Sequence, residues 1–211
     1  KSAGIERMRS RDEYGLSIVL GSLELTMEDM ARLYAMLANR GLLRSLKTDT
    51  TPGTDMSFSL LSPQAAFIAE EMLAQNPSVD GLKVGDFIRR KIRIKWKTGT
   101  SAAFRDAWAA AIFGRFVLVV WVGNFDGSGN PSFVGREAAA PLLFRIVDAV
   151  AASSAFEDEA TEEIPAGVEK VDVCAVSGAL PGRFCPAKRS AWFIPGRSPI
   201  EKCAVHRELL V

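Results

Sequence analysis

The segment Lys97-Thr98-Gly99-Thr100-Ser101 combines a cation, three hydroxyl groups and a glycine in five successive residues. Such a group suits an enzyme that must hold a peptide ending in a carboxylate and stabilise an oxyanion. Lys97 would supply positive charge, and the hydroxyls of Thr98 and Thr100 would donate hydrogen bonds to the carboxylate. Gly99 would let a substrate backbone lie close to the chain. The backbone N–H of Thr100 would complete the oxyanion hole, and Ser101 would extend the substrate-binding set.

The residues around this segment predict a three-stranded meander that would position it. Apolar and basic residues alternate over residues 91–97, which is typical of a strand with one apolar face. A short loop over residues 102–106 then leads to two apolar runs, 107–113 and 116–122, joined by a Gly114-Arg115 turn. The alternative is a plain edge strand whose lysines keep it solvated and unpaired.

Three helices are predicted around the meander. The first begins at the capping residue Thr26 and stops at Gly41, and the second begins at Ser62 with Pro63 in its first turn. The third covers residues 136–152. The apolar positions that repeat at helical spacing, and that we therefore expect in the core, are Met30, Leu33, Tyr34, Leu37, Phe67, Ile68, Met72, Leu73, Leu142, Leu143, Ile146 and Val147.

The composition is that of an ordinary soluble globular protein. The 211 residues are 48% hydrophobic and carry a formal net charge of +1, so a substantial core is expected. The near-neutral charge argues against a nucleic-acid or membrane-surface partner. No apolar run approaches the length of a transmembrane helix and no signal peptide is visible. We therefore expect any membrane anchor to lie upstream of this chain.

The three cysteines, Cys174, Cys185 and Cys203, fall in the last quarter of the chain, and the single histidine, His206, follows in a Cys-x-x-His spacing. Two interpretations compete. One is a disulfide in an oxidising compartment, with Cys174 and Cys185 as the favoured pair. The other is a zinc site with three cysteine ligands and one histidine. Unlinked thiols are a third alternative. We expect no cofactor and prefer the disulfide to the metal.

Several sequence runs occur in the order found in class A penicillin-binding proteins, which the chain resembles over nearly its whole length. The tail is similar to the extension that follows the transpeptidase domain of that family, and FRDAW beside GREAAAPLLFRIVDAV resembles the 1C subfamily. The runs that carry the resemblance are YGLSIVLGSLEL, LTMEDMARLYAMLANRG, LSPQAAFIAEEML, KTGTS, FRDAW, VVWVGNFDG, VCAVSGALPGRFCP and WFIPG.

The resemblance implies the penicillin-recognising α/β (α+β) fold, in which an antiparallel sheet is packed between helices. It also implies D,D-transpeptidation, in which an acyl-serine intermediate cross-links peptidoglycan stem peptides and can be trapped by β-lactam antibiotics. The residues that inherit roles in the substrate clamp and the oxyanion hole are Lys97, Thr98, Gly99 and Thr100. Full-length relatives also carry a glycosyltransferase domain and a membrane anchor, and act at the extracytoplasmic, periplasmic face of the inner membrane.

Two further signatures of this chemistry are missing from the chain. No serine is followed by lysine at the third position, so the Ser-x-x-Lys nucleophile is absent. The one Ser-x-Asn match, Ser128-Gly129-Asn130, follows the Lys-Thr-Gly where it should precede it, and we interpret it as chance. We therefore expect this chain to be inactive alone.

Three regions are predicted. Residues 1–156 would form the C-terminal part of a transpeptidase domain, residues 157–163 an acidic linker, and residues 164–211 a small, irregular, Cys-containing extension. Residues 42–61 would be a polar connection with a turn at Pro52-Gly53. The alternatives in function are a D,D-carboxypeptidase or β-lactamase-like hydrolase, and a peptidoglycan-binding module without chemistry.

Overall fold

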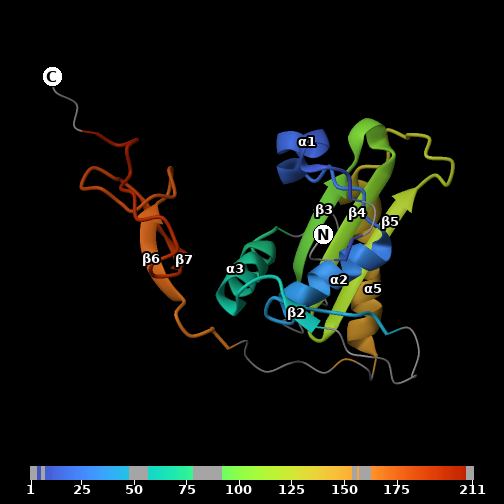
Figure 1. Cartoon of the computed structure of the whole chain (residues 1–211), viewed down its shortest axis with the longest axis horizontal. Helices are drawn as coiled ribbons and strands as arrows, with labels where there is room; N and C mark the ends of the chain where they lie inside the picture. The colour runs from blue at the N-terminus through green and yellow to red at the C-terminus, as the bar shows by residue number, and fades with distance from the viewer. Residues whose placement is uncertain are drawn as a thin grey trace. The chain divides into compact units, whose positions relative to one another are not determined.

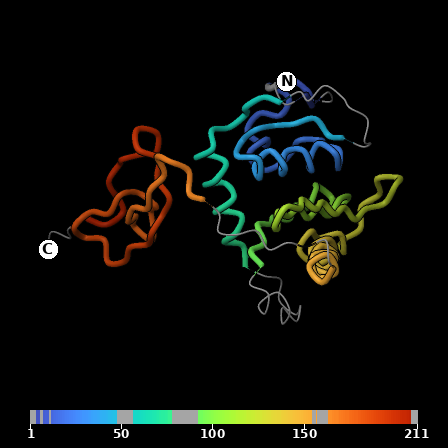
Figure 2. Tube along the Cα trace, turned by 90° about the horizontal axis from the view of Figure 1, so that it is seen from below, coloured from blue at the N-terminus to red at the C-terminus, as the bar shows by residue number. Residues whose placement is uncertain are grey.

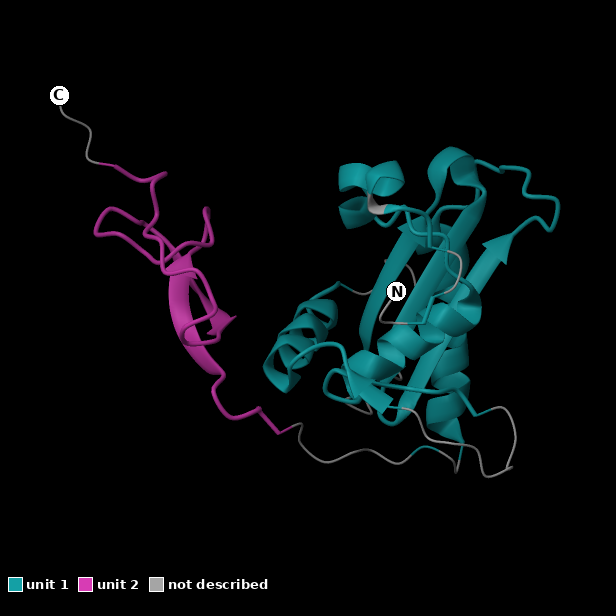
Figure 3. Ribbon diagram, in the orientation of Figure 1, with its two compact units in different colours: residues 1–162 teal, residues 163–211 magenta. Residues whose placement is uncertain are grey.

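The computed structural model describes residues 4–5, 8–47, 57–77, 92–153, 156 and 163–207. The chain divides into two compact units, residues 1–162 and residues 163–211 (Figure 3). The predicted turn at Pro52-Gly53 and nearly all of the predicted linker, residues 157–162, lie outside the described residues. In the described part of the chain, no helix combines the length and the apolar character that a membrane span requires.

The first unit is built around an antiparallel sheet of three strands in the order β3-β4-β5 (Figure 1). These are β3 (Lys95–Thr100), β4 (Asp106–Phe113) and β5 (Phe116–Gly123). Helix α2 (Met27–Ala38) packs on one face of the sheet and α5 (Ala140–Ala152) on the other, as the view in Figure 2 shows. The predicted fold class, an antiparallel sheet between helices, is confirmed, and so is the β4–β5 hairpin.

The core lies between the sheet and α5. Alanines of β4 are fully buried, and their small side chains let the helix approach the sheet closely. Trp96 of β3 packs edge-on against Phe144 of α5, with ring centroids 4.9 Å apart. Leu143 and Val147 fill the rest of the helix face and have no exposed surface. Burial of this face fixes where β3, and hence the Lys-Thr-Gly segment, stands relative to α5.

Local signals set the ends of the helices before the sheet. The Thr26 hydroxyl accepts the Asp29 N–H at 3.0 Å, and the Asp29 carboxylate accepts the Thr26 N–H, which is a complete capping box. Helix α3 (Pro63–Ala74) begins with the Ser62 hydroxyl accepting the Ala65 N–H. Gly41 ends the α2 segment with φ +87°, and a Cβ there would lie 2.2 Å from the Leu61 carbonyl oxygen. These predicted boundaries are confirmed.

Some predictions for the first unit are wrong. The expected connection over residues 42–61 contains two short paired strands, β1 (Leu42–Arg44) and β2 (Ser57–Ser59). Met72 is 67% exposed and Leu142 is 44% exposed, so neither is a core residue. Helix α5 is preceded by a π-helical turn, η3 (Gly135–Ala139), and the buried face of α5 includes Phe144. The other short elements are α1 (Arg11–Tyr14), η1 (Gly15–Leu20) and η2 (Ala102–Phe104).

The second unit is small and consists mostly of turns around one strand pair. Strands β6 (Glu169–Cys174) and β7 (Lys188–Phe193) are antiparallel. Lys170 is paired across the strands with Trp192, and its ammonium lies over the indole ring, 4.5 Å from the centroid. A parallel bridge joins Leu180 to Lys202. The composition of residues 164–211 predicts an irregular module, and these strands were not predicted from it.

Candidate functional site

The Lys-Thr-Gly-Thr segment occupies β3, at one edge of the described sheet. Ser101 donates its N–H to the Asp106 carbonyl on the β4 side at 2.9 Å. Because backbone direction alternates along an antiparallel strand, the N–H and C=O groups of Thr98 and Thr100 point away from β4. Trp96 lies two residues before Thr98, so its carbonyl also points away from β4, and it accepts a hydrogen bond from the Asn76 side-chain amide on that side. The Thr100 N–H is therefore presented at the edge of the sheet, as an oxyanion donor requires.

The side chains of the segment lie on the two faces of β3. Lys97 and Gly99 share a face with Lys95, whereas Thr98 and Thr100 share the face of Trp96 toward α5. Lys97 is exposed, and its ammonium donates to the Thr98 carbonyl at 2.8 Å. The lysine charge is therefore held at the sheet edge, beside the groups that β3 presents there.

Thr100 is positioned by Gly135, a residue that was not predicted from the sequence. The Gly135 N–H donates to the Thr100 hydroxyl at 2.9 Å. A Cβ on Gly135 would lie 2.3 Å from the Gly99 carbonyl oxygen and 2.8 Å from that of Trp108, so only glycine fits against the backbone of β3 and β4. The signal in the sequence that could have indicated this contact is the glycine at the start of GREAAAPLL, immediately before a predicted helix.

The loop after β3 is held by Asp106. Its N–H donates to the Ser101 hydroxyl at 2.8 Å, and its carboxylate accepts the Trp121 indole N–H at 2.9 Å. This pairing uses an acceptor site of the Ser101 hydroxyl, which was predicted to bind substrate. FRDAW therefore fixes the turn that follows the Lys-Thr-Gly segment.

The basic face predicted for residues 91–97 is corrected by the structure. Lys95 is only 8% exposed and pairs with Glu70 of α3, which is 5% exposed. Arg93 pairs with Glu71 at 2.5 Å. Two carboxylates of α3 therefore neutralise two of the cations, and Lys97 is the exposed lysine of strand β3. Lys91 lies outside the described residues.

Ser128 and Asn130 do not lie on β3 and have local structural partners. Asn124 donates its side-chain amide to the Ser128 hydroxyl at 2.9 Å, and the Asn130 N–H donates to the Phe104 carbonyl at 2.9 Å. A Cβ on Gly129 would lie 2.1 Å from the Ala103 carbonyl oxygen. This segment therefore packs the loop that follows β5 onto η2.

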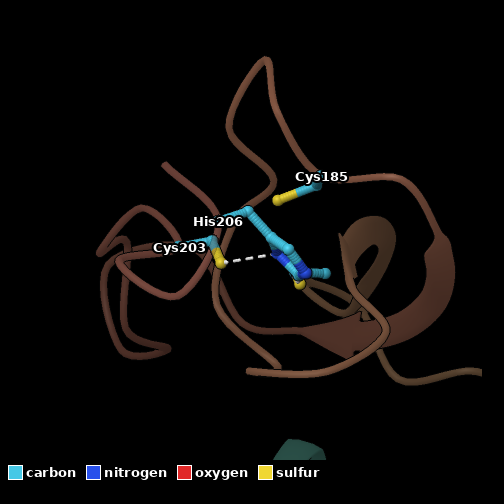
Figure 4. Close-up of side chains that lie close together, drawn as sticks. Cys185, Cys203 and His206 are labelled. Atoms are coloured by element: carbon cyan, nitrogen blue, oxygen red, sulfur yellow. Dashed lines mark hydrogen bonds between the residues drawn. The ribbon is translucent and has the colours of Figure 1, made fainter. Parts of the chain in front are cut away.

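The chain's three cysteines and its histidine meet in the second unit. Their ligand atoms all lie within 4.8 Å of one another. Figure 4 shows the side chains of Cys185 and Cys203 beside His206, with a dashed line from the Cys203 sulfur to the His206 ring. All three cysteines are free, so the predicted disulfide between Cys174 and Cys185 is not formed.

The thiols of this cluster have perturbed acidities. A hydrogen bond from the Ser177 side chain, followed by one from the His206 backbone, lowers the pKa of Cys203 to about 5. The Ser177 backbone and side chain lower the pKa of Cys174, and burial raises the pKa of Cys185. The pKa of His206 is raised by its hydrogen bond with Cys203.

Comparison with known proteins identifies relatives of both units. The family model for the C-terminal domain of penicillin-binding protein 1A matches residues 164–208. Penicillin-binding protein 1C of Escherichia coli K12 is 30% identical over 191 residues, covering 87% of this chain and 24% of the relative. Penicillin-binding protein 1A of Clostridium tetani is 31% identical over 161 residues, covering 71% and 19%. The chain thus spans about a quarter or less of the length of these relatives.

A crystal structure of penicillin-binding protein 1A from Haemophilus influenzae superposes with a TM-score of 0.68 over 92% of this chain and 36% of that chain, at 19% identity. The helix-flanked antiparallel sheet is therefore the fold found in penicillin-binding proteins. The chain belongs to the class A penicillin-binding proteins and corresponds to their C-terminal part. Relatives named 1C and 1A both occur, so the 1C assignment stays a prediction.

Proposed function

We propose that this chain is part of a D,D-transpeptidase that cross-links peptidoglycan stem peptides and is acylated by β-lactam antibiotics. The observation that carries the proposal is the outward-facing edge of β3, where an exposed lysine and the Thr100 N–H lie together on an otherwise charge-paired strand. The nucleophilic serine would come from a part of the protein outside this sequence. The class A family membership supports this assignment.

In the proposed mechanism, the stem peptide lies along β3 as an added strand. The Gly99 position leaves room for its backbone, while Lys97 from one face and the hydroxyls of Thr98 and Thr100 from the other attract its terminal carboxylate. Serine Oγ attacks the carbonyl carbon of the penultimate residue, its proton passes to a base outside this sequence, and the Thr100 N–H stabilises the negative oxygen. The peptide C–N bond then breaks, and the same base returns the proton to the nitrogen of the terminal residue, which leaves as the free amino acid. The amine of a second stem peptide attacks the acyl ester and gives up a proton to the serine oxygen, which forms the cross-link and regenerates the serine hydroxyl.

We extend the proposal to the regions of this chain and to the complete enzyme. Residues 1–156 are assigned to the transpeptidase domain and residues 164–211 to its extension. The complete enzyme would carry a peptidoglycan glycosyltransferase domain and a membrane anchor before this chain, and would act in the periplasm. Its partners would be stem peptides and β-lactams, with no nucleic acid.

The test is Lys97→Ala in the complete enzyme. Loss of one such donor is expected to slow acylation by a fluorescent penicillin by about 10²–10³-fold, since the charge that meets the carboxylate is removed. Acylation is followed by time-resolved labelling, and thermal unfolding checks the fold. The matched control is Lys188→Ala, which removes an exposed strand lysine from the second unit and should change neither.

Acylation of Lys97→Ala at the wild-type rate would contradict the clamp. The products of a stem-peptide assay decide between the alternatives. Hydrolysis without cross-linking indicates a carboxypeptidase, and tight peptide binding without acylation indicates a binding module.

A further inference from the structure

The second unit brings four metal-binding side chains together from three separate segments. Cys174 ends strand β6, Cys185 lies in the connection to β7, and Cys203 and His206 follow β7. These are all the cysteines and the only histidine of the 211 residues. None of them takes part in the site on β3, which belongs to the other unit. We infer that they form a structural zinc site with three thiolate ligands and one imidazole ligand.

The distances fit a tetrahedral ion. Zinc bonds of about 2.3 Å to sulfur and 2.0–2.1 Å to nitrogen place the sulfur and nitrogen corners of a tetrahedron about 3.5–3.6 Å apart. His206 Nδ1 lies 3.5 Å from the Cys174 sulfur and 3.4 Å from the Cys203 sulfur. His206 Nδ1 therefore lies from both sulfurs at about the distance that separates two ligand atoms of a tetrahedral zinc ion. Because all four atoms lie within 4.8 Å of one another, the Cys185 sulfur can complete the set.

Backbone hydrogen bonds contribute to the positions of these ligands. Cys203 donates its N–H to the Leu180 carbonyl at 2.8 Å, and Cys174 donates its N–H to the Ala179 carbonyl at 2.8 Å. The Gly182 N–H donates to the Cys185 sulfur at 3.3 Å. Hydrogen bonds of this kind orient ligands and stabilise thiolate charge around metal ions. The site is therefore prepared by the fold of the β6–β7 connection.

Four protein ligands leave no open position for a substrate, so the ion would be structural. The second unit needs such a support because its core is small: the buried apolar side chains among its described residues are Pro165, Val173 and Cys174. Domains of this size commonly depend on disulfides or metals. The described cysteines form no disulfide, and zinc would join the strand end, the connection and the C-terminal segment at one point.

The first measurement is made on the 211-residue chain as isolated, by elemental analysis and non-reducing peptide mapping. The second is a titration of the reduced, metal-free chain with zinc against a chromophoric chelator, with cobalt(II) as an optical probe of tetrahedral thiolate binding. We expect one zinc ion per chain, three reduced cysteines, and thiols that react with an alkylating reagent only after the metal is removed.

Three variants of one region sharpen the test. His206→Gln should weaken zinc binding by more than the roughly 10–100-fold that an outer-shell change costs. His206→Cys should retain zinc, because four cysteines also form structural zinc sites and Nδ1 lies near the base of the ring, within reach of a cysteine sulfur. Arg207→Gln, an exposed neighbour, should bind zinc as the wild type does.

Two results would overturn the zinc site. One is a disulfide between any two of these cysteines in isolated, metal-free protein. The other is a reduced chain that fails to bind zinc or cobalt. Circular dichroism of the reduced chain with and without zinc keeps the variants interpretable, since a variant that loses only the ion should still show the signal of the first unit. Neither result depends on the proposed transpeptidase activity.

Discussion

At the scale of single residues, two glycines beside the same stretch of β3 have opposite roles. Gly99 has space around its Cα, because a Cβ there would approach only the Trp108 Cβ, at an ordinary 3.7 Å. Gly135 has none, because a Cβ would collide with two backbone carbonyls. Gly99 is therefore free of a packing requirement and available for substrate, whereas Gly135 is required by the fold.

Gly99→Ala and Gly135→Ala should therefore separate binding from stability. In the complete enzyme, Gly99→Ala is expected to slow penicillin acylation while changing the free energy of unfolding by no more than about 0.5 kcal/mol. Gly135→Ala should cost about 1–3 kcal/mol through overpacking and also slow acylation, because Thr100 loses its support. Thermal unfolding and labelling of the same samples measure both. Equal losses of stability in the two variants would refute the distinction.

The residues that we propose to carry chemistry stand out in the sequence because their types are unusual together. A lysine, hydroxyls and a glycine after an alternating run indicate β3, and Cys-x-x-His indicates a metal alternative. The support given by Gly135 could not be predicted, since it depends on a contact across 35 residues. The pairing of Lys95 with Glu70 was missed for the same reason: alternation places a lysine on a face, but not a carboxylate opposite it.

At the scale of elements, α3 and β3 are joined by buried charge. The Lys95–Glu70 pair is almost inaccessible to solvent, and Arg93–Glu71 lies next to it. Removing one member of such a pair leaves an uncompensated charge in a poorly solvated place, whereas removing both with apolar replacements of similar size can be nearly neutral.

Lys95→Ala is expected to destabilise the first unit by about 3–5 kcal/mol, because Glu70 stays buried while the ammonium group of Lys95 is lost. The double variant Lys95→Met with Glu70→Leu should recover most of that loss. Denaturant unfolding of the complete enzyme measures both variants. If the double variant is no more stable than Lys95→Ala, the loss came from packing and the ion pair is not its cause.

The elements themselves were predicted best where local signals are strong. Capping by Thr26 and Ser62, the stop at Gly41 and the Gly114-Arg115 turn all have the positions that the sequence indicates. The short strands β1 and β2 were missed because three-residue strands carry too few alternations to stand out. Leu142 was misplaced because helical spacing alone did not show that the buried face of α5 contains Phe144 beside Leu143 and Val147.

At the scale of the whole molecule, two compact units with separate cores imply two separable stabilities. The resemblance to penicillin-binding proteins could be recognised from sequence runs in both units. The meeting of three cysteines and the histidine in the second unit was predicted only as an alternative to a disulfide, because the wide spacings between Cys174, Cys185 and Cys203 fit neither pattern tightly. The turns of the β6–β7 connection and the Leu180–Lys202 bridge to the segment after β7 bring them together.

Metal removal should affect one unit only. Treating the zinc-loaded chain with a chelator under reducing conditions is expected to abolish or lower the thermal transition of the second unit, because metal binding is coupled to folding there. The transition of the first unit should stay unchanged. Calorimetry measures both transitions. A chelator effect on the larger transition would show that the stabilities are not separate.

The contact of Lys170 with Trp192 provides an optical label for this experiment. The chain has four tryptophans, and Trp192 is the one that belongs to the second unit. Its indole lies under an ammonium group in the folded strand pair, so its emission must change when β6 and β7 separate. The other three indoles, those of Trp96, Trp108 and Trp121, all lie on strands of the first sheet. Subtracting the fluorescence of a Trp192→Phe variant from that of the intact chain therefore isolates the emission of Trp192. This emission reports on the unfolding of residues 163–211 alone, without cutting the chain or adding a dye.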